Sequence, residues 1–309
     1  QVLRRTVRGF AAKAGTAVVL DPRNGEVLAM ANYPLVEDHI FGVEQQYERN
    51  RAVTDAYEPG SIFKAVTISG ALMDGLTTPT TRYHLAPTIK VADRTIHEAH
   101  ARGSVTYTTR QILVNSSNVG AVTVGIDMGK DGLLKWVDKF GFGEPTGIDF
   151  PGEAVGMMHR ASKMGPVELA TSGFGQGISV TPLQLLNALC AVANGGTLMQ
   201  PMLVREVIDE SGASVRKITP TRIRQVISER TARQLSTILQ SVVVNGSGAR
   251  AAVPGYAVAG KTGTAQKPER GGYGDKRIAS FMGYAPANDR AGRQQNTRCA
   301  RTAHGPPPQ

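Results

Sequence analysis

This sequence of 309 residues has few cysteines and few aromatic residues, and it lacks any long apolar run. Its two cysteines show neither a disulfide framework nor a zinc-ligand spacing: Cys190 lies in an apolar, helical segment and Cys299 in a polar tail. No stretch of about 18 apolar residues occurs, so we expect no segment to cross a bilayer as a helix.

Acidic residues are missing from both ends of the chain. Residues 1–13 carry four basic side chains and no acid, and residues 290–309 also carry four and no acid. Most of the formal net charge of +10 therefore lies at the ends. A nucleic-acid-binding protein needs a basic face on its folded body, so we predict no nucleic-acid partner. Residues 1–13 are predicted to be a basic, amphipathic lead-in.

What the sequence does contain is a change of hydrophobic period along its length. Apolar runs at residues 16–20 and 27–31 flank turn-forming residues and predict a hairpin. Helical spacing dominates the middle of the chain, where Thr181 before Pro182 and Ser228 are predicted helix caps. The pattern predicts an α+β fold with one domain over 14–288, its sheet from 14–50 and 251–288 and its helical subdomain from about 51–250.

In "YEPGSIFKAV", Ser61 follows a Pro-Gly pair and precedes Lys64 by three residues. Residues three apart share one face of a helix, and a lysine made neutral by burial beside Phe63 could accept the serine proton. The first N–H groups of a helix also favour developing negative charge. The common alternative is a capping serine beside a solvated lysine.

The segment "NSSNVG", residues 115–120, predicts a polar turn between two helices. Ser116 and Asn118 are two residues apart, so both side chains could face one cleft. A hydroxyl can relay a proton there and a carboxamide can hold a substrate amide. Taken alone, the segment could equally be an ordinary polar turn.

The segment "GKTGT", residues 260–264, is preceded by Gly255 and so matches the phosphate-loop pattern G-x-x-x-x-G-K-[ST]. That motif needs a helix after its lysine, whereas Gly263 follows Thr262 directly and Pro268 would end any helix within a few residues. The residues between Gly255 and Gly260 are apolar and typical of a strand. We therefore reject a nucleotide site and predict a strand.

On a strand, Lys261 and Gly263 face one side while Thr262 and Thr264 face the other. Lys261 would attract a carboxylate and the two threonines could hold it. A residue as small as Gly263 would leave room for a substrate backbone that pairs with the strand.

Two further patterns carry less weight. "HEAH", His97 to His100, is not the H-E-x-x-H zinc pattern, and we predict no metal site. Gly173, Gly175 and Gly177 form a bare G-x-G-x-G, which indicates a tight loop at the cleft edge rather than a dinucleotide site. No cofactor is predicted.

In this order, S-x-x-K, S-x-N and K-T-G resemble the signature of penicillin-binding proteins and serine β-lactamases. Longer segments, including "RNRAVTDAYEPGSIFK" and "GFGQGISVTPLQLLNALCAVANGGTLMQP", look like the transpeptidase domain of class B penicillin-binding proteins. The resemblance is greatest to the cell-division and sporulation type and covers roughly residues 14–286.

This resemblance implies a serine-type D,D-transpeptidase. Ser61 would attack the carbonyl between the two terminal D-alanines of a peptidoglycan stem peptide, and Lys64 would act as base. Ser116 and Lys261 would help to move the proton to the leaving D-alanine. The N–H groups of Ser61 and Thr264 would form the oxyanion hole. Substrate binding would fall to Asn118, Thr262, Gly263 and Thr264.

The resemblance also implies the surroundings of such an enzyme: stem peptides as substrates, β-lactams as covalent inhibitors, cell-division proteins as partners, and the extracytoplasmic face of the bacterial cell membrane. Two alternatives stay open, a D,D-carboxypeptidase and a non-catalytic fragment that binds division partners. A β-lactamase is disfavoured because no glutamate stands in an E-x-x-L-N context.

The end of the sequence departs from the family pattern. In the family, the last of five antiparallel strands lies centrally in the sheet and a C-terminal helix follows. Residues 289–309 contain no Val, Ile, Leu, Met or aromatic residue, so we expect a disordered, aberrant tail. The sequence therefore predicts that the central strand and the C-terminal helix are missing, with sheet edges left unpaired.

Overall fold

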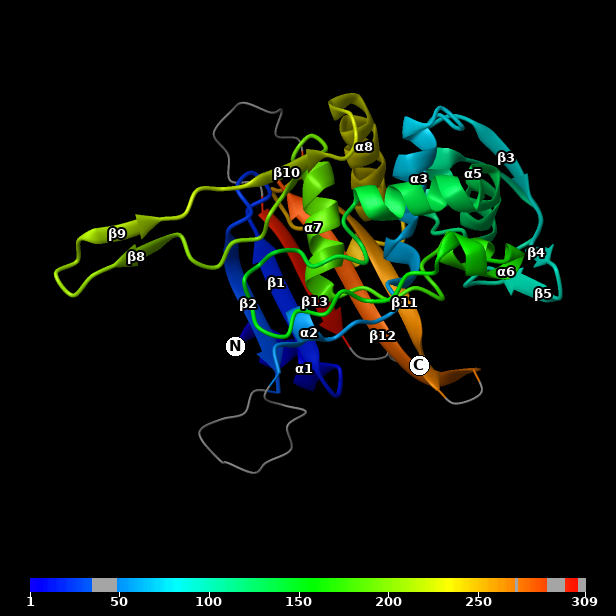
Figure 1. Ribbon diagram of the computed structural model, residues 1–309. Coiled ribbons are helices and arrows are strands. Elements are labelled where there is room, and N and C mark those ends of the chain that lie inside the picture. Colours follow the sequence, from blue (N-terminus) through cyan, green and yellow to red (C-terminus); the bar gives the residue numbers. More distant parts are fainter. Residues whose placement is uncertain (35–48, 270–271, 288–297, 305–309) are drawn as a thin grey trace.

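The computed structural model describes residues 1–34, 49–269, 272–287 and 298–304. Figure 1 shows a sheet crossed by a helix on one side of the molecule and a cluster of helices on the other, with a narrow hairpin extending from the body. The predicted α+β fold with a sheet and a helical subdomain is confirmed.

The main sheet is antiparallel and has five strands, in the order β11-β12-β13-β1-β2. The predicted hairpin at the start of the chain and the predicted strands before residue 288 are confirmed. The strand bounds are β1 Gly15–Leu20, β2 Val27–Tyr33, β11 Ala259–Glu269, β12 Gly272–Ala285 and β13 Arg298–His304.

Strand β13 occupies the centre of this sheet. Ala300 lies opposite Val19 of β1 on one side and opposite Gly283 of β12 on the other. The prediction of a missing central strand and a wholly disordered tail is therefore wrong for residues 298–304. Pairing on both sides satisfies the backbone N–H and C=O groups of a strand even where its sequence lacks large apolar residues.

For the rest of the predicted tail, the outcome depends on which residues are described. Residues 288–297 and 305–309 lie outside the described part of the chain, and the described residues after β12 contain no helix.

The helices lie mostly in the middle of the chain, as the hydrophobic spacing predicts. Short 3-10 turns accompany them at Gly60–Ile62, Ala161–Lys163 and Ala249–Ala251. The helix bounds are α1 Val2–Gly9, α2 Arg51–Thr54, α3 Lys64–Met73, α4 Thr109–Val114, α5 Asn118–Lys139, α6 Pro166–Ser172, α7 Pro182–Ala193 and α8 Glu229–Asn245.

Both predicted helix caps are present. Thr181 accepts from the N–H of Gln184, and the Gln184 side chain accepts from the N–H of Thr181, so α7 begins with a capping box. Ser228 accepts from the N–H of Thr231 at 3.2 Å and caps α8. Nearly all of α7 is buried, and the helix packs across β1, β12 and β13 (Figure 1).

Short two-stranded sheets complete the fold. One of them, the hairpin of β8 and β9, projects away from the body, and all its strand residues are exposed (Figure 1). The pairs are β3 Arg82–Leu85 with β6 Val105–Thr108, β4 Thr88–Val91 with β5 Arg94–His97, β7 Thr197–Met199 with β10 Arg222–Gln225, and β8 Glu206–Ile208 with β9 Ser214–Lys217.

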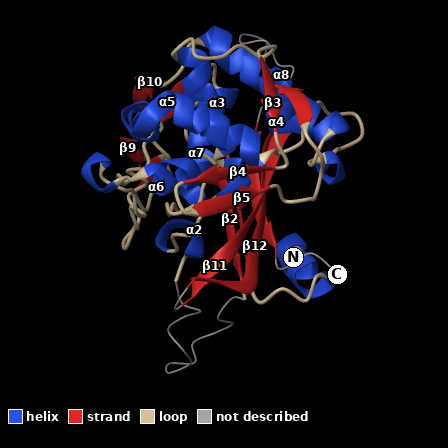
Figure 2. Ribbon diagram, turned by 90° about the vertical axis from the view of Figure 1, so that its right-hand side faces the viewer, coloured by secondary structure: helices blue, strands red, loops and turns tan. Residues whose placement is uncertain are grey.

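Part of the predicted basic lead-in forms helix α1. Leu3 and Val7 are buried on β1 and β2, and the Arg8 Nε donates to the Tyr33 hydroxyl at 3.1 Å. Figure 2 shows this helix beside the lower part of the sheet, away from the helical cluster. Among the helices that are described, none has the length and apolar character needed to cross a membrane.

Candidate active site

Ser61 lies in the 3-10 turn Gly60–Ile62, directly before α3, and is half-buried. Gly60 has a φ of +55°, which disfavours any side chain, and a Cβ there would lie 2.8 Å from the carbonyl oxygen of Thr264. Its N–H donates to the carbonyl of Gly175 at 3.0 Å. The predicted tight loop around Gly175 thus packs against one side of the nucleophile turn and strand β11 against another.

Lys64 is the first residue of α3 and is fully buried. Its Nζ donates to the carbonyl oxygen of Ser116 at 2.6 Å and to Oδ1 of Asn118 at 2.7 Å. Burial, followed by the charge of Lys261, holds the pKa of Lys64 well below its usual value, and Glu98 partly opposes this. A neutral amine bonded in this way retains a lone pair for accepting a proton.

Ser116 owes its position to the way α4 ends. It has a φ of +56°, its N–H donates to the carbonyl of Leu113, and the N–H of Ser117 donates to the carbonyl of Ile112. This is the Schellman arrangement, with Ser116 at the left-handed site that usually holds glycine. Ser117 then caps α5 by accepting from the N–H of Gly120 at 3.0 Å. The S-x-N motif is therefore a rigid junction of two helices.

Lys261 approaches Ser116 from the sheet. It is fully buried on β11, and its Nζ donates to the Ser116 hydroxyl at 2.9 Å and to the Thr262 carbonyl at 3.0 Å. Burial lowers the pKa of Lys261 to about 7. The Nζ of Lys64 lies 3.5 Å from the same hydroxyl, so Ser116 Oγ stands between two lysine amines.

The predicted alternation along β11 is confirmed: Lys261 and Gly263 are buried, Thr262 is half-buried and Thr264 is exposed. No helix follows Lys261, because β11 continues to residue 269, which agrees with rejecting a phosphate loop. The Thr262 hydroxyl donates to Ser247 Oγ at 3.2 Å.

The predicted reason for Gly263 is wrong. A Cβ at Gly263 would lie 2.9 Å from Ile62 Cγ1 and 3.0 Å from the carbonyl oxygen of Pro59. The space beside this glycine is therefore filled by the nucleophile turn and not left for a substrate backbone. Gly60 and Gly263 together let the turn and the strand approach closely, which brings Ser61 and Thr264 to neighbouring positions.

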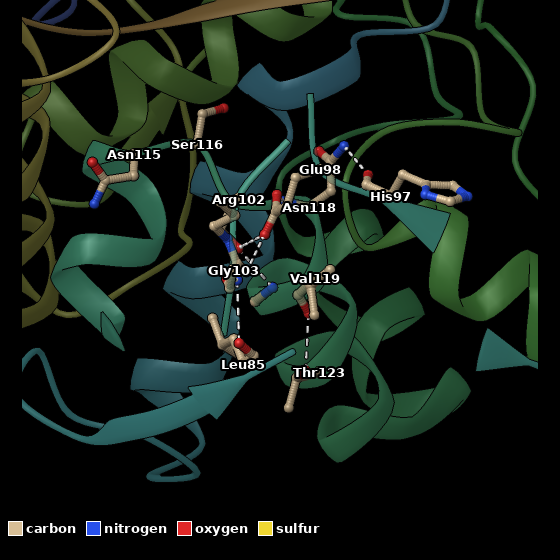
Figure 3. A network of polar contacts seen from close by, with 12 residues as sticks. Leu85, His97, Glu98, Arg102, Gly103, Asn115, Ser116, Asn118, Val119 and Thr123 are labelled. Atoms are coloured by element: carbon tan, nitrogen blue, oxygen red, sulfur yellow. Dashed lines mark hydrogen bonds and ion pairs between the residues drawn. The ribbon is translucent and has the colours of Figure 1, made fainter. Parts of the chain in front are cut away.

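The sequence did not predict the contacts of two glutamates near the site, Glu98 and Glu58. Glu98, which the sequence presents only within "HEAH", holds the S-x-N turn through its two carboxylate oxygens (Figure 3). Glu58 accepts from the N–H of Gly177 at 2.9 Å and from the Tyr273 hydroxyl at 3.0 Å, and burial raises its pKa. Their partners lie far along the chain, so no local pattern could have found them.

The described part of the chain contains no group of three or more His, Cys, Asp and Glu side chains able to hold a metal. At "HEAH" in particular, the glutamate is already engaged by hydrogen-bond donors and by Arg102.

Comparisons with known proteins identify the family of this chain. A family model described as the penicillin binding protein transpeptidase domain matches residues 15–291. Stage V sporulation protein D of Bacillus subtilis is 41% identical over 278 residues, which cover 88% of this chain and 43% of that protein. Probable peptidoglycan D,D-transpeptidase PbpC of Pseudomonas aeruginosa is 35% identical, over 94% of this chain and 50% of that protein. The chain spans about half the length of these curated relatives.

Solved structures show the same architecture. The transpeptidase domain of Burkholderia pseudomallei penicillin-binding protein 3 matches with a TM-score of 0.82 and 34% identity, over 97% of this chain and 82% of that one. Penicillin-binding protein 3 of Mycobacterium tuberculosis in complex with aztreonam matches with a TM-score of 0.88 and 31% identity, over 99% of this chain and 70% of that one. The chain belongs to the penicillin-binding protein transpeptidase family.

Proposed function

We propose that this member of the penicillin-binding protein transpeptidase family is a serine D,D-transpeptidase domain that cross-links peptidoglycan. The observation that carries the proposal is the pair of fully buried lysines, Lys64 and Lys261, on either side of the Ser116 hydroxyl and next to the turn that holds Ser61. Burial of both amines favours their neutral forms, which can exchange protons with a hydroxyl near neutral pH.

In the acylation step, Ser61 Oγ attacks the carbonyl of the penultimate D-alanine and its proton passes to the neutral Nζ of Lys64. The bond to the terminal D-alanine breaks, and its nitrogen takes a proton through the Ser116 hydroxyl, which Lys261 and Lys64 both contact. The N–H groups of Ser61 and Thr264 hold the oxyanion; such a donor is worth about 3 kcal/mol in other acyl-transfer enzymes. An amine of a neighbouring stem peptide then takes the acyl group from Ser61.

Substrate binding follows from the place of β11. In the described part of the sheet β11 is an edge strand, so its outer backbone groups can pair with an extended stem peptide. Thr262 and Thr264 then hold the terminal carboxylate and Asn118 orients the substrate amide. Gly263 contributes its backbone, because the nucleophile turn fills the space beside its Cα.

β-Lactams fit the same site as covalent inhibitors of Ser61. Penicillin-binding protein 3 of Mycobacterium tuberculosis has been crystallised with aztreonam and with ampicillin, and the two structures match 99% and 98% of this chain. Because peptidoglycan lies outside the cytoplasm, we propose that this domain acts on the extracytoplasmic face of the bacterial cell membrane. The division proteins expected as partners stay a prediction.

The test is labelling with a fluorescent penicillin. We expect a covalent label that survives denaturation in the wild type and disappears in Ser61→Ala, with equal melting temperatures. Ser211→Ala, in the projecting hairpin, should label like the wild type. Undiminished labelling of Ser61→Ala would remove Ser61 as the nucleophile and sink the proposal.

A second assay separates the two acyl acceptors. A stem pentapeptide is incubated with the enzyme and a D-amino acid, whose amino group is the acyl acceptor, and the products are resolved by mass. If the domain is a transpeptidase, the main product is the peptide in which the added amine replaces the terminal D-alanine. Release of the tetrapeptide alone would instead make the domain a D,D-carboxypeptidase.

A further inference from the structure

Glu98 lies in the loop between β5 and β6, and its side chain is only 6% exposed. Figure 3 shows it between Arg102 and Asn118, while the ring of His97 points away from this network. Nothing in the proposed acylation step uses this carboxylate, although it is buried directly behind the S-x-N turn.

Each carboxylate oxygen of Glu98 engages the turn. Oε1 accepts from the Ser117 hydroxyl at 2.5 Å, and Oε2 accepts from the N–H of Asn118 at 2.6 Å. Hydrogen bonds of this length to an ionised acceptor are among the strong ones in proteins. Because Ser117 stands between Ser116 and Asn118, the carboxylate holds the middle of the motif from behind.

The same loop also orients the Asn118 side chain. Asn118 Nδ2 donates to the carbonyl oxygen of His97 at 2.9 Å, which leaves Oδ1 facing the Nζ of Lys64 at 2.7 Å. The backbone and the carboxamide of Asn118 are therefore both fixed by residues 97 and 98, on the side away from Lys64.

Arg102 holds Glu98 in place. Its Nη2 pairs with Glu98 Oε1 at 2.5 Å, and its Nη1 donates to the carbonyl oxygens of Leu85 and Gly103. The guanidinium also lies over the ring of Tyr107, 5.6 Å from its centroid. The carboxylate is thus tied to the small sheet of β3 and β6 and is a rigid support for the turn.

We propose that Glu98, held by Arg102, is a positioning residue of the active site that keeps Ser116 and Asn118 against Lys64 without touching substrate. This inference rests on the proposed function, because it assigns Glu98 a part in the same proton transfer. It acts through the turn, whose two outer residues meet the lysine.

The charge of Glu98 adds a second effect in the same place. It raises the pKa of Lys64, against burial and the charge of Lys261, and so makes Lys64 a stronger base. The charged group facing Glu98 itself is Arg102. The neighbouring titratable side chains are His97 at the end of β5 and His100 in the loop, and both are exposed.

The test compares Glu98→Gln and Glu98→Asp with the wild type in acylation by a penicillin. Varying the drug concentration separates the acylation rate constant from drug binding, and the series is repeated from pH 5 to 9. Glu98→Gln keeps the size of the side chain but loses its charge and one acceptor. We expect its acylation rate constant to fall by about tenfold to a hundredfold, with drug binding little changed, because small misplacements of reacting groups are costly.

The pH profile provides a readout that a merely structural residue would not move. Acylation needs neutral Lys64, so its rate falls below the pKa of that lysine. Without the charge of Glu98 this pKa drops further, and the acidic limb of Glu98→Gln should shift to lower pH. Glu98→Asp, which keeps the charge, should restore the wild-type limb and part of the rate. Glu206→Gln in the projecting hairpin serves as the control and should change neither quantity.

Two outcomes overturn the inference while leaving Ser61 as nucleophile: an unchanged rate constant in Glu98→Gln, or a reduced one with an unshifted limb and a lowered melting temperature. An unlabelled wild type instead overturns the proposed function. In that case amide hydrogen exchange tests the positioning role of Glu98 independently. If the carboxylate holds the turn, Glu98→Gln must speed exchange at the N–H of Asn118. Unchanged exchange there rejects the positioning role.

Discussion

The two sides of the candidate active site, called here the helical wall and the sheet wall, are held in place by different forces. The helical wall carries Lys64 and Asn118 at helix starts that are packed into the apolar core, where Phe63 and Ile112 are fully buried. The sheet wall carries Lys261 on β11, which is connected through β12 to the central strand β13. Side-chain burial thus positions one wall and backbone pairing positions the other, so perturbations of the two should have different signatures.

The largest expected effect separates the two lysines. Lys64→Met should slow penicillin acylation by on the order of a thousandfold, because it removes the base, whereas Lys261→Met should cost about a hundredfold. Stopped-flow acylation measures both, and thermal melts confirm that both variants fold. Equal losses would contradict the assignment of Lys64 as the base that takes the Ser61 proton.

The next effect concerns the sheet wall. Ala300→Pro should destabilise the protein by about 2–3 kcal/mol, because a proline in the central strand removes a ladder hydrogen bond and cannot be accommodated between two partners. Urea unfolding measures the loss. Val215→Pro, in the projecting hairpin whose residues are all exposed, is the matched control and should leave the global unfolding transition unchanged.

A third variant tests where the walls meet. Gly60→Ala places a Cβ 2.8 Å from the Thr264 carbonyl oxygen at a φ of +55°, so the nucleophile turn and β11 must move apart. Gly75 also has a positive φ, +71°, but nothing lies within 4 Å of its Cβ position. Gly75→Ala should therefore cost only about 1 kcal/mol of backbone strain. Gly60→Ala should lower the free energy of unfolding by about 2 kcal/mol and also slow acylation. Comparing the acylation rates of Gly60→Ala and Gly75→Ala checks the second effect.

The most gradual effect, spread over several pH units, is the pH dependence of stability. Lys261 has a pKa of about 7 when folded and near 10.5 when unfolded, so between these values the unfolded chain binds a proton that the folded chain lacks. Stability should accordingly rise from pH 7 to pH 9, by at most about 1.4 kcal/mol per pH unit for each such lysine. Lys261→Met should flatten this slope in thermal melts. An identical slope in the variant would show that Lys261 is not held neutral by the fold.

The difference between the walls also explains how far prediction from sequence reached. The S-x-N motif and the caps Thr181 and Ser228 are local patterns, and the structure has the predicted turn and caps where the sequence placed them. The S-x-x-K motif was predicted within one helix, but Ser61 lies in a 3-10 turn and the helix begins at Lys64. Strand β13 escaped prediction because its place depends on two partner strands and not on its own apolar pattern.

Glu98 was missed for a similar reason. Its partners Ser117 and Asn118 stand 19 and 20 residues further along the chain, a separation that no local spacing rule covers. The true neighbours of Gly263 were equally hidden, since Pro59 and Ile62 meet it only in the folded chain. The sequence thus predicts the chemistry within each segment, but the contacts that align the segments are non-local.

The left-handed backbone of Ser116 reveals a compromise between the stability of the fold and the chemistry of the site. At this helix end glycine would relieve the backbone strain, so selection for stability alone would replace the serine. Its hydroxyl, held between two lysine amines, is the benefit that offsets this penalty. A serine found where a helix ending favours glycine is therefore a mark of function, and the same mismatch can be sought in sequences whose motifs are too degraded to recognise.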